Sequence, residues 1–161
     1  MIRIAGSADA GALAELRARW IVERRSVGPD ATFAERFAAW FATESHQRTF
    51  WLATEDDEPV GMANLLAFER MPGPGIDAGR WGYLGNMFVR AEHRNAGIGH
   101  LLLAAVVANA DARGLERIVL SPSERSVSFY RSAGFGDAHQ LLLRPGAGEG
   151  VPPSEHAPPH R

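Results

Sequence analysis

The fold is decided by the stretch Arg94-Asn95-Ala96-Gly97-Ile98-Gly99, which lies between a strand-like run and a helical pattern. The strand-like run ends at residues 86–89, and the apolar residues that follow the stretch keep a helical spacing until Gly114. Glycines at a helix start let a ligand approach the backbone closely, because they carry no Cβ. The free N–H groups of this first turn, with the positive end of the helix dipole and the Arg94 guanidinium, predict an anion site.

Length and composition restrict the class of protein. The chain has 161 residues, 45% hydrophobic and 22% charged, and predicts one soluble globular domain. Its net charge of -2 gives no overall attraction to nucleic acid or to a membrane surface, so we expect neither as a partner. The chain contains no cysteine, and its histidines show no metal-ligand spacing, so no metal site is expected. No secretory signal is recognisable, and we expect a cytoplasmic location.

The N-terminal part predicts a strand and two helices. Residues 2–5 form the strand, and the first helix places Leu13, Leu16 and Trp20 on one face. Thr32 and Glu35 form a capping box at the start of the second helix. That helix has an aromatic stripe, which we expect in the core or, at its end, in the wall of a substrate pocket: Phe33, Phe37, Trp40 and Phe41.

The middle of the chain predicts strands separated by two loops. Residues 49–54 and 60–68 form a hairpin with an acidic loop of four or five residues, and residues 83–89 form the next strand. The intervening segment, 70–82, is rich in Gly and Pro. It is either a lid or edge of the substrate site or a flexible connector.

The C-terminal part predicts two strands around one helix. A strand at 117–120 is followed by a helix over 124–133, which Ser123 caps and Gly134 ends, and a last strand covers 135–144. Residues 145–161 hold half of the ten prolines and little apolar content, so this tail is predicted to be disordered.

The segment from Asn86 to Phe135 resembles the GNAT superfamily of acyl-CoA-dependent N-acetyltransferases. The signature of that family is Arg or Gln, two residues, Gly, any residue, then Gly or Ala, and Arg94, Gly97 and Gly99 match it. The later stretch 126–135, in which Tyr130 is followed by a Gly-Phe pair, is similar to the closing segment of the family. The resemblance implies an α/β (α+β) fold in a single domain over residues 1–144. Its central sheet would be mixed and mostly antiparallel, with about six to seven strands flanked by about four helices.

The resemblance also implies which residues bind acetyl-CoA as co-substrate. In the family, the strand before the glycine motif splays from its neighbour, and the pantetheine arm fills the gap. Backbone groups of Met87, Phe88 and Val89 would bind that arm, and one N–H there would polarise the thioester carbonyl. Ser123 stands where the family often has an Asn that contacts the arm. The diphosphate would bind beside Arg94 to the amides of Asn95, Ala96, Gly97, Ile98, Gly99 and His100.

Tyr130 is the candidate for proton delivery, and the general base is missing. A phenol with a pKa of about 10 can protonate a leaving thiolate, whose thiol has a pKa of about 8.5. The alternative is a half-buried Tyr that only packs the last helix. Many relatives carry a carboxylate at the positions of Gly85 or Asn86, and this chain has none there. Either a chain of waters replaces it or Glu69, at the end of the preceding strand, does so.

We therefore expect an N-acetyltransferase that moves an acetyl group from acetyl-CoA directly to a primary amine of an unidentified acceptor, with a homodimer possible. The alternative is a catalytically silent acyl-CoA-binding sensor or partner module. A dinucleotide-binding Rossmann unit fits poorly, because Leu102 occupies the third glycine position and Leu120-Ser121 replaces the expected acidic residue.

Overall fold

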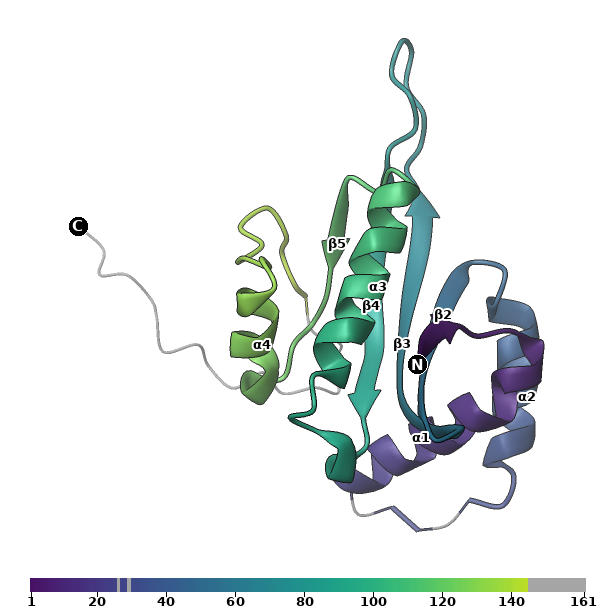
Figure 1. Ribbon diagram of the computed structural model, residues 1–161. Helices are drawn as coiled ribbons and strands as arrows, with labels where there is room; N and C mark the ends of the chain where they lie inside the picture. Colours follow the sequence, from purple (N-terminus) through teal and green to yellow (C-terminus); the bar gives the residue numbers. More distant parts are fainter. Residues whose placement is uncertain (26, 29, 145–161) are drawn as a thin grey trace.

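The computed structural model describes residues 1–25, 27–28 and 30–144, in which one five-stranded sheet lies between helices (Figure 1). The strands are β1 (Ile2–Ile4), β2 (Arg48–Glu55), β3 (Glu58–Glu69), β4 (Arg80–Val89) and β5 (Arg117–Val119). The α-helices are α1 (Ala10–Arg24), α2 (Phe33–Glu44), α3 (Ile98–Ala112) and α4 (Val127–Ser132). Short 3-10 turns lie at η1 (Ser7–Asp9), η2 (Ala91–His93) and η3 (Glu124–Ser126).

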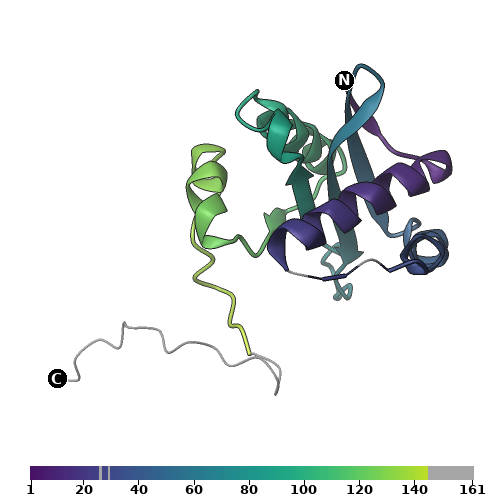
Figure 2. The same ribbon diagram turned by 90° about the horizontal axis from the view of Figure 1, so that it is seen from below.

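The sheet separates two layers of helices and two hydrophobic cores. Seen from below, α1 and α2 lie on one side of the sheet and α3 on the other, with α4 beside α3 (Figure 2). Leu102 and Val106 of α3 pack against one face, whereas Leu13 and Leu16 of α1, with Phe41 of α2, pack against the other. Within the described residues, no helix combines the length and the apolar character that crossing a membrane requires.

The sheet is mixed and mostly antiparallel, as the sequence predicts. The strands lie in the order β1-β2-β3-β4-β5. The first three neighbouring pairs are antiparallel, and only β4 and β5, joined through α3, run parallel. The number of strands is lower than the six to seven expected, since the described residues contain five.

The strand predicted over residues 135–144 is wrong. This segment is irregular in the structure, and Leu142 and Leu143 are exposed. Three consecutive leucines do not distinguish the two faces of a sheet, and β5 is too short to offer a long ladder on its outer edge. The predicted disordered tail, 145–161, lies outside the described residues.

Two turn predictions also need correction. The loop of the β2–β3 hairpin consists of Asp56 and Asp57 alone, so it has two residues rather than four or five. Their φ angles of 48° and 64° are both positive, as in a type I′ turn. The capping box at α2 does not form. The Thr32 hydroxyl donates instead to Asp30 Oδ1, at 2.9 Å.

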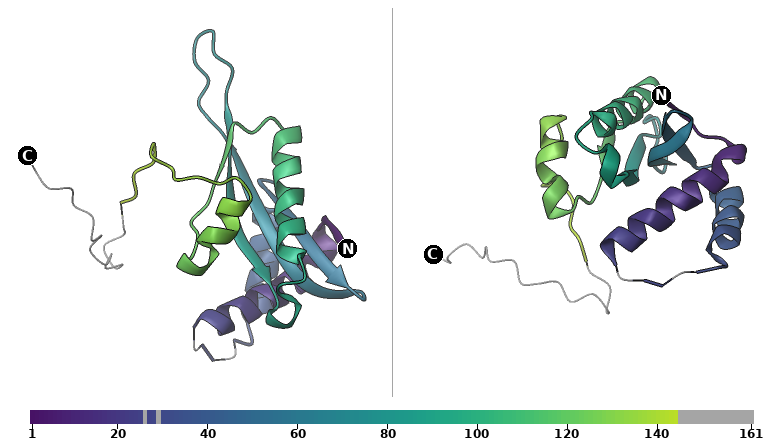
Figure 3. Two further views of the ribbon diagram at one scale, coloured as in Figure 1. Left: turned by 60° about the vertical axis from the view of Figure 1, so that its left-hand side comes forward. Right: turned by 60° about the horizontal axis from the view of Figure 1, so that its bottom comes forward.

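The Gly/Pro-rich segment is the tip of a long hairpin. β4 begins at Arg80 rather than at residue 83, and the Arg70 N–H donates to the Gly79 carbonyl at 2.8 Å. The tip projects beyond the body of the domain, clear of the helices (Figure 1 and Figure 3). Cross-strand pairs stiffen its base: the Phe68 and Trp81 rings lie 6.0 Å apart, centroid to centroid.

Candidate active site

A β-bulge interrupts β4 at the centre of the sheet. Met62 of β3 faces Phe88 and Asn64 faces Gly85, so Ala63 alone lies opposite two residues of β4. One of these, Asn86, has a φ of 50°, a left-handed conformation that Asn tolerates better than most residues. The extra residue, Asn86, lines the pocket on one side of the sheet, whereas Met87 packs on the α3 side.

Beyond the bulge, the described residues leave the edge of β4 that faces away from β3 without a partner strand. β5 pairs with β4 only from Trp81 to Tyr83. Further along, the Val89 carbonyl accepts a hydrogen bond from Arg94 Nε at 2.9 Å and so points away from β3. By strand alternation, the peptide groups of Met87 share that direction, while those of Phe88 face β3. Met87 and Val89 therefore offer backbone groups to a ligand at this edge, and Phe88 does not.

The turn before α3 presents a row of free amides. Asn95 and Gly97 have φ angles of 64° and 83°, and the first helical hydrogen bond runs from the Leu101 N–H to the Gly97 carbonyl, at 3.1 Å. The described residues provide no acceptor for the backbone N–H groups of 95–100. A Cβ at Gly97 would meet nothing within 4 Å, so its positive φ, rather than crowding within the protein, is what requires glycine here.

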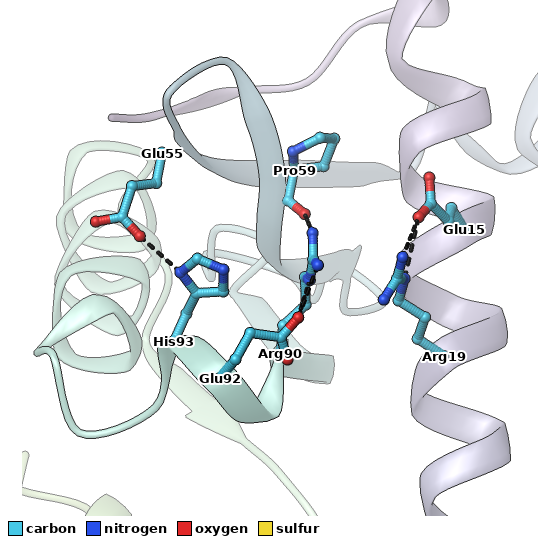
Figure 4. A network of polar contacts seen from close by, with 7 residues as sticks. All are labelled: Glu15, Arg19, Glu55, Pro59, Arg90, Glu92 and His93. Carbon is cyan, nitrogen blue, oxygen red and sulfur yellow. Dashed lines mark hydrogen bonds and ion pairs between the residues drawn. The ribbon is translucent and has the colours of Figure 1, made fainter.

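Polar contacts hold the segment 90–93, which leads from β4 to this turn, against its neighbours (Figure 4). Arg90 donates to Glu92 Oε1 at 2.8 Å and to the Pro59 carbonyl at 3.4 Å. His93 Nδ1 lies 2.6 Å from Glu55 Oε2 of β2, while the ion pair of Arg19 with Glu15 stands nearby on α1. These contacts fix the segment between β4 and α3 to the β2–β3 hairpin.

The Arg94 side chain links neighbouring elements of the fold. Its guanidinium forms an ion pair with Glu23 of α1 and, through Nε, binds the Val89 carbonyl. The sequence predicts a cation beside the anion site. The structure places that cation in a contact that joins α1, the end of β4 and the turn, so that the backbone amides are the main donors left for an anion.

Tyr130 reaches β4 from α4. Its hydroxyl lies 3.7 Å from Met87 Sδ, and its ring packs edge-on against Phe129 and Phe135, with centroids 5.1 and 5.8 Å away. Burial raises the pKa of the Tyr130 phenol above its usual value. The phenol therefore stays protonated near neutral pH and can donate a proton at the open edge of β4.

The remaining predicted site residues lie at different distances from this centre. His100 packs its ring against Phe129, with centroids 4.8 Å apart, next to the free amides. Ser123 is exposed, and its hydroxyl lies 2.9 Å from that of Ser126. Glu69 is not brought to the centre. It pairs with Arg80 at 3.1 Å, at the opposite end of β4 from Met87, about 23 Å away at ~3.3 Å per residue.

A pocket of about 330 Å³ opens on the α1 and α2 side of the bulge. Phe41 of the aromatic stripe is in the core, whereas the other three aromatic side chains of α2 form one wall of this pocket. The tip of the β3–β4 hairpin supplies none of the described lining. The lining residues are Leu13, Arg17, Phe33, Arg36, Phe37, Trp40, Phe50, Met62, Ala63, Asn64 and Asn86.

Sequence reasoning missed the polar members of this pocket. Asn64 is 2% exposed, and its Oδ1 accepts from Arg48 Nη1 at 3.3 Å. Arg17 Nη1 is shielded from water without a hydrogen-bond partner among the described residues, and desolvation by burial lowers the pKa of Arg17. No local pattern signals these residues, because they come from α1 and β3 and meet only in the folded chain.

The family follows from comparison with known proteins. The profile of the Acetyltransferase (GNAT) family matches residues 13–135, which is most of the chain. The chain therefore belongs to the GNAT family of acetyltransferases. Comparison with curated proteins gives no match.

Solved structures share the fold over nearly the whole chain. A predicted acetyltransferase from Clostridium acetobutylicum, solved with acetyl-CoA, is 23% identical with a TM-score of 0.74, covering 90% of this chain and 95% of that one. A GCN5-related N-acetyltransferase from Ralstonia eutropha is 25% identical with a TM-score of 0.70, covering 92% and 99%. Glucosamine-6-phosphate N-acetyltransferase from Arabidopsis thaliana is 13% identical with a TM-score of 0.71, covering 89% and 96%.

Proposed function

We propose that this protein transfers an acetyl group from acetyl-CoA directly to a primary amine. One observation carries the proposal: Asn86 and Met87, neighbours at the bulge, belong to opposite faces of the sheet. Asn86 lines the pocket between α1 and α2, and Met87 contacts the Tyr130 hydroxyl. An acceptor in the pocket and a thioester at the edge of β4 would thus meet across a single residue step.

The free amides and the open edge suit coenzyme A. The N–H groups of residues 95–100 and the positive end of the α3 dipole would hold the diphosphate. The peptide groups of Met87 and Val89 would hold the pantetheine arm as an added strand. Acetyl-CoA, when bound, supplies a thioester carbonyl as the electrophile. A backbone N–H at this edge would stabilise the oxyanion that develops on it.

Tyr130 completes the transfer. The neutral amine attacks the thioester carbonyl, a C–N bond forms and the C–S bond breaks. The departing sulfur takes the Tyr130 proton, and the proton that the attacking nitrogen loses returns through water to restore the phenol, so the step leaves no net charge on Tyr130. With no cysteine in the chain, we propose direct transfer without a covalent cysteine intermediate.

The proton of the incoming ammonium leaves through water in this scheme. None of the described residues that line the pocket is acidic, and Glu69 lies at the far end of β4. A pocket without carboxylates also does nothing to hold the ammonium in its charged form, so the neutral amine is not disfavoured there.

The proposal is tested by cofactor binding followed by turnover. Calorimetry and thermal shift with CoA and acetyl-CoA should show binding and stabilisation, and a panel of primary amines should release free thiol from acetyl-CoA. Absence of both heat and stabilisation would sink the proposal. Binding without thiol release from any amine would favour the silent acyl-CoA-binding module instead.

A further inference from the structure

The pocket between α1, α2 and the sheet holds a positive charge that the described residues do not neutralise. Its charged lining residues are Arg17 and Arg36. Arg36 forms an ion pair with Asp30. Arg17 forms no ion pair within the described part of the chain, and its Nη1 is hidden from water without an acceptor there. The lining therefore carries about one positive charge in excess.

The surroundings of Arg17 keep its guanidinium in place without pairing it. Its Cζ lies 4.3 Å from the centroid of the Trp20 ring, a cation–π contact that also orients the planar group. Arg24, at the end of α1, and Arg25, just after it, carry the same sign and lower the pKa of Arg17 further. The carboxylate of Glu15, two positions before Arg17 in sequence, is paired with Arg19, at 2.9 Å. A buried donor left without an acceptor is rare in proteins, and in a pocket a bound ligand can supply the missing acceptor.

The rest of the pocket suits an apolar body. Three aromatic side chains of α2 and Phe50 of β2 form its walls, and Leu13 and Met62 add aliphatic surface. Its volume of about 330 Å³ is at the small end of ligand sites and fits a metabolite rather than a peptide segment. The amide side chains of Asn64 and Asn86 belong to β3 and β4, next to the edge where the transfer would occur.

We propose that the acceptor is a small amine that carries a carboxylate and an apolar or aromatic body, and that Arg17 binds the carboxylate. This inference rests on the function proposed above. The planar fork of a guanidinium binds a carboxylate through two parallel hydrogen bonds. One unpaired guanidinium balances one carboxylate, whereas a phosphate dianion would leave a surplus of negative charge in a half-buried site.

The test uses amines in matched pairs. L-phenylalanine, L-leucine and para-aminomethylbenzoate are each compared with their carboxamides, and phosphoethanolamine serves as the phosphate control. Thiol release from acetyl-CoA gives kcat/KM for each. At least one carboxylate should exceed its carboxamide by about 10-fold or more, the discrimination expected when a charge-assisted pair replaces a neutral contact.

Two arginine variants then separate recognition from packing. Arg17→Leu should lower kcat/KM for the preferred carboxylate by about 10- to 100-fold and change its carboxamide by less than about threefold. CoA affinity should be unaffected. The melting temperature should stay the same or rise, because an unpaired buried charge is removed. Arg24→Leu, on the same helix and within 5.4 Å of the same Trp20 ring but outside the pocket lining, should keep the preference.

Each contrary result identifies what has failed. Equal rates for every pair, or a preference for phosphoethanolamine, overturn the carboxylate assignment and leave the acetyltransferase proposal standing. Binding of CoA together with acetylation of other amines, but of none of the carboxylates, leads to the same conclusion. If Arg17→Leu lowers the melting temperature and reduces kcat/KM equally for a carboxylate and its carboxamide, Arg17 has a structural role only. Failure to bind CoA removes the proposed function itself.

Discussion

The two sides of β4 are built by different means. On the α3 side, a turn of consecutive residues carries its own left-handed conformations. A contact of His93 with Glu55 of the β2–β3 hairpin and the ion pair of Arg94 with Glu23 of α1 hold it. On the opposite side, the pocket is assembled from residues of α1, α2, β2, β3 and β4, and a half-buried arginine has no partner there among the described residues. Under the proposed function, the site for the co-substrate is a local motif, whereas the site for the acceptor is a product of packing.

Tyr130→Phe should produce the largest effect and confine it to the chemical step. The phenyl ring keeps the packing against Phe129 and Phe135 but cannot donate a proton, so kcat should fall by about 100-fold, in the range of general acid catalysis. Steady-state kinetics with calorimetry of CoA binding measures both quantities. An unchanged kcat would remove Tyr130 from the chemistry and leave it a packing residue.

Phe37→Ala should damage only the acceptor side. The Phe37 ring is in contact with Phe33, Trp40 and Phe41, with centroids 5.9, 5.5 and 6.3 Å away. Loss of this part of the wall should lower kcat/KM for the acceptor by about 10-fold, as expected for aromatic contacts, and leave CoA affinity unchanged. Weaker CoA binding in this variant would mean that the two sides of β4 are not independent.

Gly97→Ala should damage only the co-substrate side, and less strongly. Gly97 has a φ of 83° with open space around the place of a Cβ, so the cost is conformational, about 1–2 kcal/mol for a non-glycine residue. That cost should weaken CoA binding several-fold or lower the melting temperature, while the KM of the acceptor stays the same. Wild-type stability together with wild-type CoA affinity would contradict the role assigned to the turn.

The smallest effect is expected at the start of α1, the helix that carries Arg17. The Arg3 side chain, with the Gly6 N–H, lowers the pKa of Asp9 from 3.8 to about 2. A carboxyl whose pKa is lowered by folding stabilises the folded state at pH values above its pKa in the unfolded chain. This contribution is therefore complete above about pH 4 and is lost as the pH falls towards 2. Since the Arg3 side chain is exposed, solvent screens the ion pair and we expect a small effect.

The comparison is made between wild type and Asp9→Asn over that pH window. Denaturant unfolding at pH 7 should show Asp9→Asn as the less stable protein. The difference should shrink as the pH approaches 2, because wild-type Asp9 becomes protonated there. A difference that stays constant with pH would show that the ion pair contributes nothing and that the substitution acts through the hydrogen bond alone.

What could be predicted from the sequence follows the same division. The strand–turn–helix around Gly97 and the closing helix before Gly134 are local patterns, and both form. The closing helix differs from the prediction in its first turn, which is the 3-10 turn η3, and the Ser123 side chain makes no capping hydrogen bond. The predicted length of the β2–β3 loop is wrong, because Asp56 and Asp57 adopt the positive φ angles of a two-residue turn, for which glycine is the usual signal. The pocket could not be predicted, since Arg17 and Asn64 become neighbours of the aromatic stripe only through the packing of α1 and α2 on the sheet.

The bulge at Asn86 makes this architecture dependent on one surplus residue. A β4 shortened by that residue would pair with β3 without interruption. Met87 would lie opposite Ala63, still on the α3 side, and the pocket would lose the Asn86 side chain. Such a protein would gain a more regular ladder and lose the bulge at which, under the proposed function, the acceptor and the thioester meet. Stability and catalysis therefore make opposite demands on a single position, and a screen for thermal robustness alone would favour the deletion.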